Sequence, residues 1–162
     1  MRDFVELNDL YPLIKEVLDN GGTFRFYPRG TSMEPLLHAG SDSIVLDSVK
    51  DIAAGDVLFY KRKNGQFVLH RVVKVAKDGS YTMCGDNQYA REQGIKHSQI
   101  IGIVTEFNRN GKDISCKNPL YVFYCFIHVK KQYIYGIYAR ARKKIVRIIK
   151  KLIIDKEKNK EK

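Results

Sequence analysis

Apolar and polar residues alternate with a helical period at the start of the chain. Within residues 3–19 the apolar side chains recur at steps of three and four: Phe4, Leu7, Leu10, Leu13, Ile14, Val17 and Leu18. This spacing predicts an amphipathic helix or a pair of helices. Pro12 indicates either a break or a proline in the first turn of a helix, and Asn20-Gly21-Gly22 indicates the end of the helical region.

From Thr23 onward the period changes to that of β-strands. Runs rich in β-branched and aromatic residues occupy 23–27, 43–46, 56–60, 67–75, 81–84 and 100–107. Glycine-containing turns separate the runs, and Asn64-Gly65 and Asp78-Gly79 are typical of tight hairpins. The pattern predicts a coiled, mainly antiparallel β-domain of about six or seven strands, with its core in residues 23–114.

Helical spacing returns after Pro119 and becomes basic. One side of residues 134–152 is apolar, and the other side carries lysine and arginine. Residues 155–162 contain no apolar residue, which predicts disorder. The expected organisation is therefore a mainly β domain with an N-terminal helix in residues 1–118, a basic amphipathic helical segment in 119–154, and a disordered tail in 155–162.

The charge is concentrated at the C-terminal end. The chain has 162 residues, enough for one domain with a hydrophobic core, and its net charge is +11. Residues 1–118 contain 16 Lys+Arg and 15 Asp+Glu, whereas residues 119–162 contain 13 and 3. The basic character therefore belongs to the C-terminal segment, which we interpret as an attachment surface.

Three interpretations of this basic segment stay open. A helix lying on an anionic membrane surface through residues 130–154 is favoured by the density of lysine, arginine and tyrosine. The second interpretation is a helix docked on the β-domain with a solvated basic face. The third is a binding site for an acidic leader peptide or nucleic acid. No nucleic-acid-binding motif accompanies the charge, so nucleic acid is not expected as a partner.

The cysteines and the N-terminus narrow the class of protein. Cys84, Cys116 and Cys125 form no CxxC pair and have no zinc-ligand spacing, so neither a metal nor another cofactor is predicted. The first ten residues are too acidic and too broken for a signal peptide, and no run of about 18 uncharged apolar residues occurs. These features predict a cytoplasmic or peripherally membrane-associated protein.

Candidate chemistry lies in two short stretches. Ser32 follows Gly30 and precedes Pro35, in a turn that can expose its hydroxyl and aim its backbone N–H at an oxyanion. His70 lies in the β-rich run 67–75. A serine needs a base to become a nucleophile, and imidazole suits that task near neutral pH. An ordinary turn serine and an ordinary strand histidine are commoner, so spacing alone only suggests a Ser/His hydrolase.

Several short sequence blocks, in their residues and in their order, resemble those of the signal peptidase I superfamily, which also includes the self-cleaving SOS-type repressors. Residues 30–36 (Gly-Thr-Ser-Met-Glu-Pro-Leu) are similar to its nucleophile block, in which Met-x-Pro follows the serine. Residues 55–60 are similar to its Gly-Asp-hydrophobic strand. Residues 68–72 (Val-Leu-His-Arg-Val) and 85–87 (Gly-Asp-Asn) are similar to its base block and Gly-Asp block. The resemblance spans residues 23–107 and implies that superfamily's coiled antiparallel β-domain.

The resemblance also implies roles for single residues. Endoplasmic-reticulum and many archaeal signal peptidases place a histidine base before Arg-Val, where bacterial signal peptidases use a lysine. By this resemblance Ser32 attacks the scissile carbonyl, and its backbone N–H serves the oxyanion. His70 takes the serine proton and returns it to the leaving amine. The relatives place further acids at positions matching Asp86 and Glu92, and an aspartate is usual at the second of these.

The resemblance implies a serine endopeptidase that cleaves a leader or signal-like segment from a peptide or protein. Met33 and Pro35 are expected to contact that substrate. Two features depart from the relatives. Signal peptidases have a transmembrane segment before the serine, and none is expected before Ser32. The repressors have a DNA-binding domain and a scissile Ala-Gly or Cys-Gly bond before the serine, and neither is expected before Ser32. The alternative is a non-catalytic peptide-binding or membrane-surface adaptor module on the same fold. For an enzyme, activity should rise as His70 loses its proton, at roughly pH 6–7 for an unperturbed imidazole.

Overall fold

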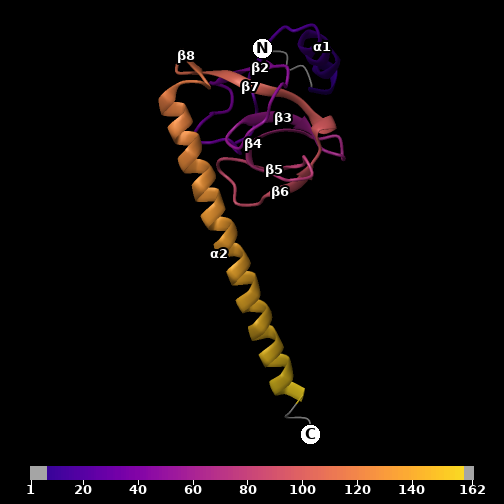
Figure 1. The fold of residues 1–162 in the computed structure, drawn as a ribbon, viewed down its shortest axis with the longest axis vertical. Coiled ribbons are helices and arrows are strands. Elements are labelled where there is room, and N and C mark those ends of the chain that lie inside the picture. Colours follow the sequence, from indigo (N-terminus) through magenta and orange to yellow (C-terminus); the bar gives the residue numbers. More distant parts are fainter. Residues whose placement is uncertain (1–6, 159–162) are drawn as a thin grey trace.

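The chain folds into a β-domain with one helix at each end (Figure 1). The computed structural model describes the backbone of residues 7–158, and within the last helix it leaves out the side chains of residues 136, 139–141, 143, 144, 146 and 148–158. The elements are α1 (Leu7–Asp19), β1 (Phe24–Phe26), β2 (Ser43–Asp47), β3 (Val57–Lys61), β4 (Phe67–Val75), β5 (Tyr81–Cys84), β6 (Glu92–Ile95), the 3-10 turn η1 (His97–Gln99), β7 (Ile100–Arg109), β8 (Lys112–Ser115) and α2 (Pro119–Lys158).

The strands form one antiparallel sheet. Their order is β1-β2-β7-β3-β4-β5-β6, and β8 pairs with β7. The register shifts within the pairs β2/β7, β3/β7, β4/β5 and β5/β6. Such bulges increase the local right-handed twist, so the sheet coils around its own core instead of lying flat. The predicted fold class, a coiled antiparallel β-domain, is confirmed.

Two short strands, β6 and β8, fall outside the runs that the β-pattern marks. β6 contains Gly94 and β8 contains two charged residues, so neither has a typical strand composition. Both form because a neighbouring strand offers a free edge: Ile95 pairs with Tyr81 of β5, and Ile114 pairs with Phe107 of β7. β6 matters for the site because Glu92 is its first residue.

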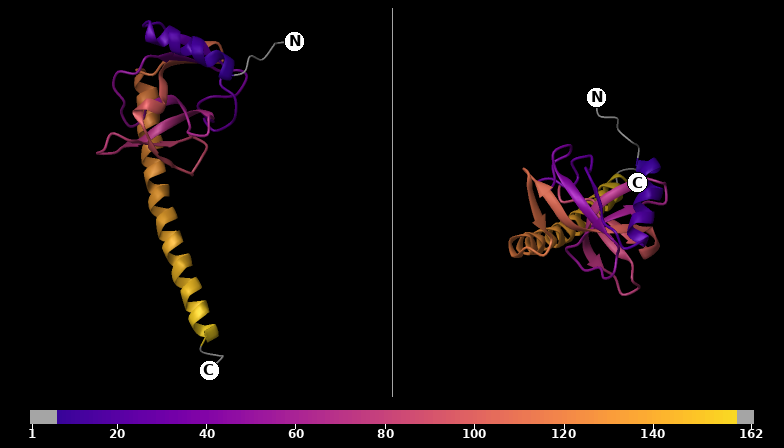
Figure 2. Two further views of the ribbon diagram at one scale, coloured as in Figure 1. Left: turned by 90° about the vertical axis from the view of Figure 1, so that its right-hand side faces the viewer. Right: turned by 90° about the horizontal axis from the view of Figure 1, so that it is seen from above.

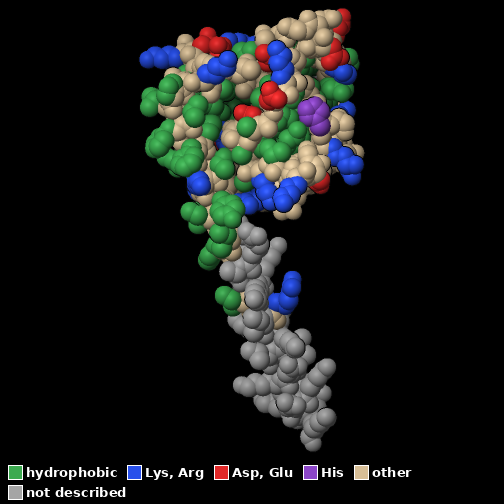
Figure 3. All heavy atoms as spheres, in the orientation of Figure 1, with side chains coloured by type: hydrophobic (Ala, Val, Ile, Leu, Met, Phe, Trp, Pro, Cys, Tyr) green, Lys and Arg blue, Asp and Glu red, His purple; other side chains and the backbone are tan. Residues whose placement is uncertain are grey.

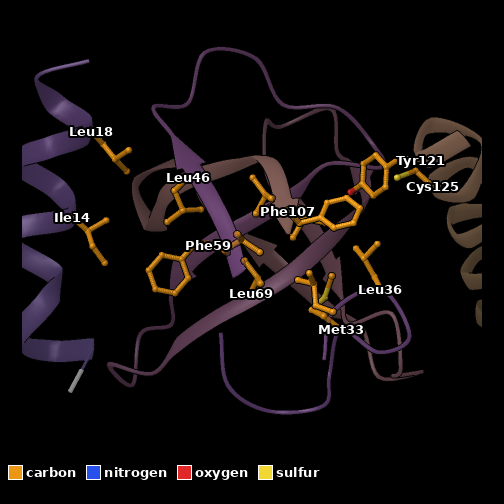
Figure 4. Close-up of a cluster of buried hydrophobic side chains, with 14 residues drawn as sticks. Ile14, Leu18, Met33, Leu36, Leu46, Phe59, Leu69, Phe107, Tyr121 and Cys125 are labelled. Carbon is orange, nitrogen blue, oxygen red and sulfur yellow. The ribbon is translucent and has the colours of Figure 1, made fainter. Parts of the chain in front are cut away.

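The larger hydrophobic cluster joins the sheet to both helices and to the segment around Ser32 (Figure 4). Its buried members are Ile14, Leu18, Met33, Leu36, Leu37, Ile44, Leu46, Val57, Phe59, Leu69, Val104, Phe107, Tyr121 and Cys125. Burying an aliphatic or aromatic side chain of this size contributes about 1.5–3 kcal/mol relative to leaving it exposed. The cluster therefore fixes the segment 33–37 firmly against the sheet, immediately after the candidate nucleophile.

Helix α1 is one continuous helix, not a broken pair. Pro12 lies inside this helix, beyond its first turn, and does not break it. The helix persists because Ile14 and Leu18, on its inner face, are buried against the sheet (Figure 4). Residues 3–6 of the predicted helical region lie outside the described residues.

Helix α2 packs on the β-domain with its first part and then extends beyond it (Figures 1 and 2). It ends at Lys158, so residues 155–158 are helical where disorder is predicted. Lysine and glutamate have good helix propensity, which allows the helix to continue without apolar residues. Residues 159–162 of the predicted tail lie outside the described residues. No helix in the described part of the chain has the length and apolar character needed to cross a bilayer.

Candidate active site

Ser32 lies in the turn between β1 and β2. Gly30 has a φ of 86°, a backbone conformation that favours glycine, and it directs the chain into this turn. After the serine, Glu34 N–H donates to the Thr31 carbonyl at 3.2 Å and Leu37 N–H donates to the Met33 carbonyl at 3.0 Å. The buried side chains of Met33 and Leu37 hold the far end of the turn, so Ser32 stays at the surface of a rigid segment.

The tripeptide Gly85-Asp86-Asn87 packs directly on this turn. Asn87 N–H donates to the Ser32 carbonyl at 2.9 Å, and the Asn87 side chain donates to the Thr31 carbonyl at 3.3 Å. A Cβ at position 85 would lie 2.5 Å from the Ser32 carbonyl oxygen. Only glycine allows this approach, which explains why the block after β5 begins with one.

Asp86 is engaged by Arg71 and α2 and makes no hydrogen bond to His70. The Arg71 guanidinium donates to both of its carboxylate oxygens, at 2.8 and 2.7 Å, and both side chains are buried. From α2, the Tyr124 hydroxyl donates to the Asp86 carboxylate at 3.1 Å, and His128 Nε2 lies 3.0 Å from the Asp86 carbonyl oxygen. Asp86 therefore connects the segment that supports Ser32 to the first part of α2.

Glu92 reaches His70 through a tyrosine instead of directly. The Tyr60 hydroxyl donates to Glu92 Oε2 at 2.8 Å and lies 3.4 Å from His70 Nδ1. Arg62 donates to both oxygens of Glu92, at 3.0 and 2.9 Å. Burial and the neighbouring Glu92 raise the pKa of Tyr60, so its hydroxyl keeps its proton.

This chain of contacts selects one tautomer of His70. Because the single Tyr60 proton points to Glu92, the tyrosine oxygen can only accept from Nδ1–H of His70. The other ring nitrogen, Nε2, then carries a lone pair, which is the form that a general base needs. Burial, together with the positive charge of Arg62, lowers the pKa of His70 to about 4, against the opposing effect of the negative charges of Glu92 and Asp86.

The lowered pKa changes the expected pH dependence. An unperturbed imidazole predicts a transition at roughly pH 6–7. With a pKa of about 4, the His70 ring is uncharged throughout the pH range around 7 and becomes protonated only in acid. The cause is its position inside β4, where the side chain is 4% exposed.

Ser32 and His70 line the same cavity, whose volume is about 230 Å³. Met33 also lines it, whereas Pro35 is exposed and lies outside the lining. Among the described residues, the Ser32 hydroxyl makes no hydrogen bond to His70, and its backbone N–H donates to no other group. Catalytic hydrogen bonds are often loose before substrate binds, so this geometry is compatible with a Ser/His pair.

Tyr60 and Arg62 are the parts of this arrangement that sequence reasoning missed. In the register of β3 and β4, His70 lies opposite Leu58, and Tyr60 is the diagonal neighbour on the same face. The available signal was the spacing of Tyr60 within β3, two residues after the partner of His70. That signal can be recognised only once the register is known.

Comparison with known protein families decides the class. The model of the family described as Peptidase S24-like matches residues 3–105. The chain belongs to the Peptidase S24-like family. This confirms the resemblance to the superfamily of signal peptidase I and the SOS-type repressors, and it assigns a serine peptidase or autopeptidase fold. No curated protein and no solved structure matches the chain significantly.

Proposed function

We propose that this Peptidase S24-like protein is a serine endopeptidase that removes a leader or signal-like segment from a peptide or protein, with Ser32 as nucleophile and His70 as base. The observation that carries the proposal is that both side chains line one cavity on a serine peptidase fold. The tautomer of His70 supports it, because Nε2 is the ring nitrogen that has no hydrogen-bond partner among the described residues.

In the proposed reaction, the Ser32 hydroxyl oxygen attacks the scissile carbonyl carbon while its proton passes to His70 Nε2. The backbone N–H of Ser32 is available to donate to the oxyanion that forms. The imidazolium then gives its proton to the leaving amine. In the second half of the reaction His70 takes a proton from the water that attacks the acyl-enzyme, and it returns that proton to the Ser32 oxygen as the product leaves. Nδ1–H donates throughout to Tyr60, whose partner Glu92 offsets the positive charge on the ring.

In this proposal Asp86 acts at a distance from the reacting atoms. It holds Arg71 and α2 and keeps Asn87 against the Ser32 carbonyl. Met33 contributes a wall of the cavity that receives the substrate. Pro35 then acts only through the shape of the turn.

The test is incubation of the purified protein with a diverse peptide pool, read by mass spectrometry. We expect cleavage products from the parent and at least about a thousandfold less from Ser32→Ala and His70→Ala. Ser98→Ala and His97→Ala serve as matched controls, because both residues lie in η1 away from the cavity, and they should cleave like the parent.

Equal cleavage by the parent and Ser32→Ala would refute the proposed nucleophile. Some members of the family are non-catalytic, so peptide binding with no serine-dependent product would favour the peptide-binding module. The intact mass of the purified chain would separate both outcomes from self-cleavage, since a self-cleaving chain would lose mass only when Ser32 is present.

A further inference from the structure

Helix α2 has an inner face that packs on the β-domain. Tyr121, Cys125, His128 and Gln132 are buried, and they recur at three- and four-residue steps along one side of the helix. Arg71 donates to Tyr121 and Cys125, and the Gln132 amide donates to the Gln88 carbonyl at 2.6 Å. Every later α2 residue whose side chain is described is exposed. The β-domain thus covers one side of the first part of α2 only.

The outer face of α2, opposite this contact, is apolar and exposed. At 3.6 residues per turn its members share the side away from the β-domain: Phe123, Phe126, Ile127, Ile134, Ile137, Tyr138 and Ile145. Ile134 and Tyr138 are both 66% exposed, and Phe126 is 60% exposed. Figure 3 shows hydrophobic side chains gathered over the upper part of this helix. Isolated exposed apolar residues are normal, but a continuous face of this kind marks an interaction surface.

Positive charge accompanies the outer face. Residues 119–162 contain 13 Lys+Arg and only 3 Asp+Glu. Lys131 and Arg142, at the border of the apolar face, are exposed. Lys130 lies within the face, and its ammonium sits 5.4 Å from the centre of the Phe126 ring. A lysine at such a position can keep its stem in an apolar layer while its ammonium reaches phosphate groups.

We propose that the outer face of α2 binds the surface of an anionic lipid bilayer. Aromatic and aliphatic side chains on one face with lysine and arginine beside them are the features of helices that lie in the membrane interface. The β-domain occupies the opposite side of the helix, so it does not obstruct this contact.

Two other partners fit the outer face of α2 less well: a second copy of this chain and nucleic acid. A second copy of α2 would bring another strongly basic segment against the first and would place Lys130 in the apolar seam. Nucleic acid would match the charge but would leave Phe123, Ile134 and Ile137 without an apolar partner. An anionic bilayer satisfies both the apolar face and the charge.

The experiment measures co-sedimentation of the full chain with vesicles, using Ser32→Ala so that proteolysis does not interfere. We expect binding to vesicles of phosphatidylcholine and phosphatidylglycerol in equal parts. Binding should be lost on phosphatidylcholine alone and in high salt. The Ile134→Asp/Ile137→Asp variant should bind at least about tenfold more weakly, because two apolar side chains no longer enter the bilayer. Neither residue packs on the β-domain, so the variant should fold.

Leu13→Asp/Val75→Asp is the matched control, since it adds the same charges at exposed aliphatic residues of α1 and β4. Its affinity for the anionic vesicles should lie within about threefold of the parental affinity. Absence of binding to anionic vesicles, or equal loss in the control, would overturn the proposal. A dimer that Ile134→Asp/Ile137→Asp dissociates in sedimentation equilibrium would assign the face to a second copy. Tighter binding to duplex DNA than to the vesicles would assign the segment to nucleic acid. None of these readouts depends on the proposed peptidase activity.

Discussion

The turn that holds Ser32 and the strand that holds His70 are each supported by a carboxylate–arginine pair, but the two pairs lie in different environments. Asp86 and Arg71 are each 1% exposed, whereas Glu92 and Arg62 are 27% and 30% exposed. The first pair sits among α2 residues and supports the backbone near the serine. The second sits at the edge of the sheet and contacts the tyrosine beside the histidine.

This difference separates two functions of similar residues. A buried pair is costly to break, because the partner left behind is a charge without water. Such a pair is suited to fixing the position of a loop. A partly exposed pair contributes little to folding, because solvent screens it. Near a titratable ring it can still set the position of a proton, and we interpret the Glu92–Tyr60–His70 contacts in this way.

The largest expected effect follows removal of the buried acid. Asp86→Ala leaves Arg71 buried without its partner and should lower the free energy of unfolding by about 3–5 kcal/mol, measured by urea denaturation. Glu92→Gln should cost less than about 1 kcal/mol in the same assay. If Asp86→Ala kept the parental stability and lost only activity, Asp86 would be a catalytic group, and the structural role assigned to the buried pair would be wrong.

A smaller effect is expected when the link between Glu92 and His70 is cut. Tyr60→Phe removes the hydroxyl that accepts from Nδ1, so the productive tautomer is no longer selected. We expect kcat/KM to fall about 10- to 100-fold, while stability changes by about 1 kcal/mol. Tyr81→Phe is the matched control, because its hydroxyl contacts His97 outside the cavity at 3.2 Å. An unchanged kcat/KM in Tyr60→Phe would exclude the tyrosine from the mechanism.

The smallest effect concerns pH. In the proposed mechanism only neutral His70 can accept the serine proton, so kcat/KM should stay constant through the neutral range and fall in acid with a midpoint near pH 4. Arg62→Gln removes a charge that lowers the pKa of His70 and frees Glu92, which raises it. Both changes move the midpoint upward, by about one pH unit or less. A parental midpoint at pH 6–7 would show that burial does not perturb the ring.

Most strands of the sheet can be recognised from their own residues. The runs 43–46, 56–60 and 67–75 contain their own strand signal, since β-branched and aromatic residues lie between glycine turns. The blocks around Ser32 and His70 were found because they are short and local. β6 and β8 were missed because their strand character comes from the neighbour that they pair with.

The sequence by itself determined the order of the two helices and of strands β1 to β5 and β7, the antiparallel β class, the basic C-terminal segment and the family-like blocks that contain Ser32 and His70. Only the tertiary structure decided which partner each acid takes. Asp86 meets Arg71 because β4 and β5 pair in a given register, and Glu92 meets Tyr60 because β6 adds to the edge of a coiled sheet. Local patterns record what a segment prefers. Contacts between distant segments depend on register, bulges and helix packing, which no local pattern encodes.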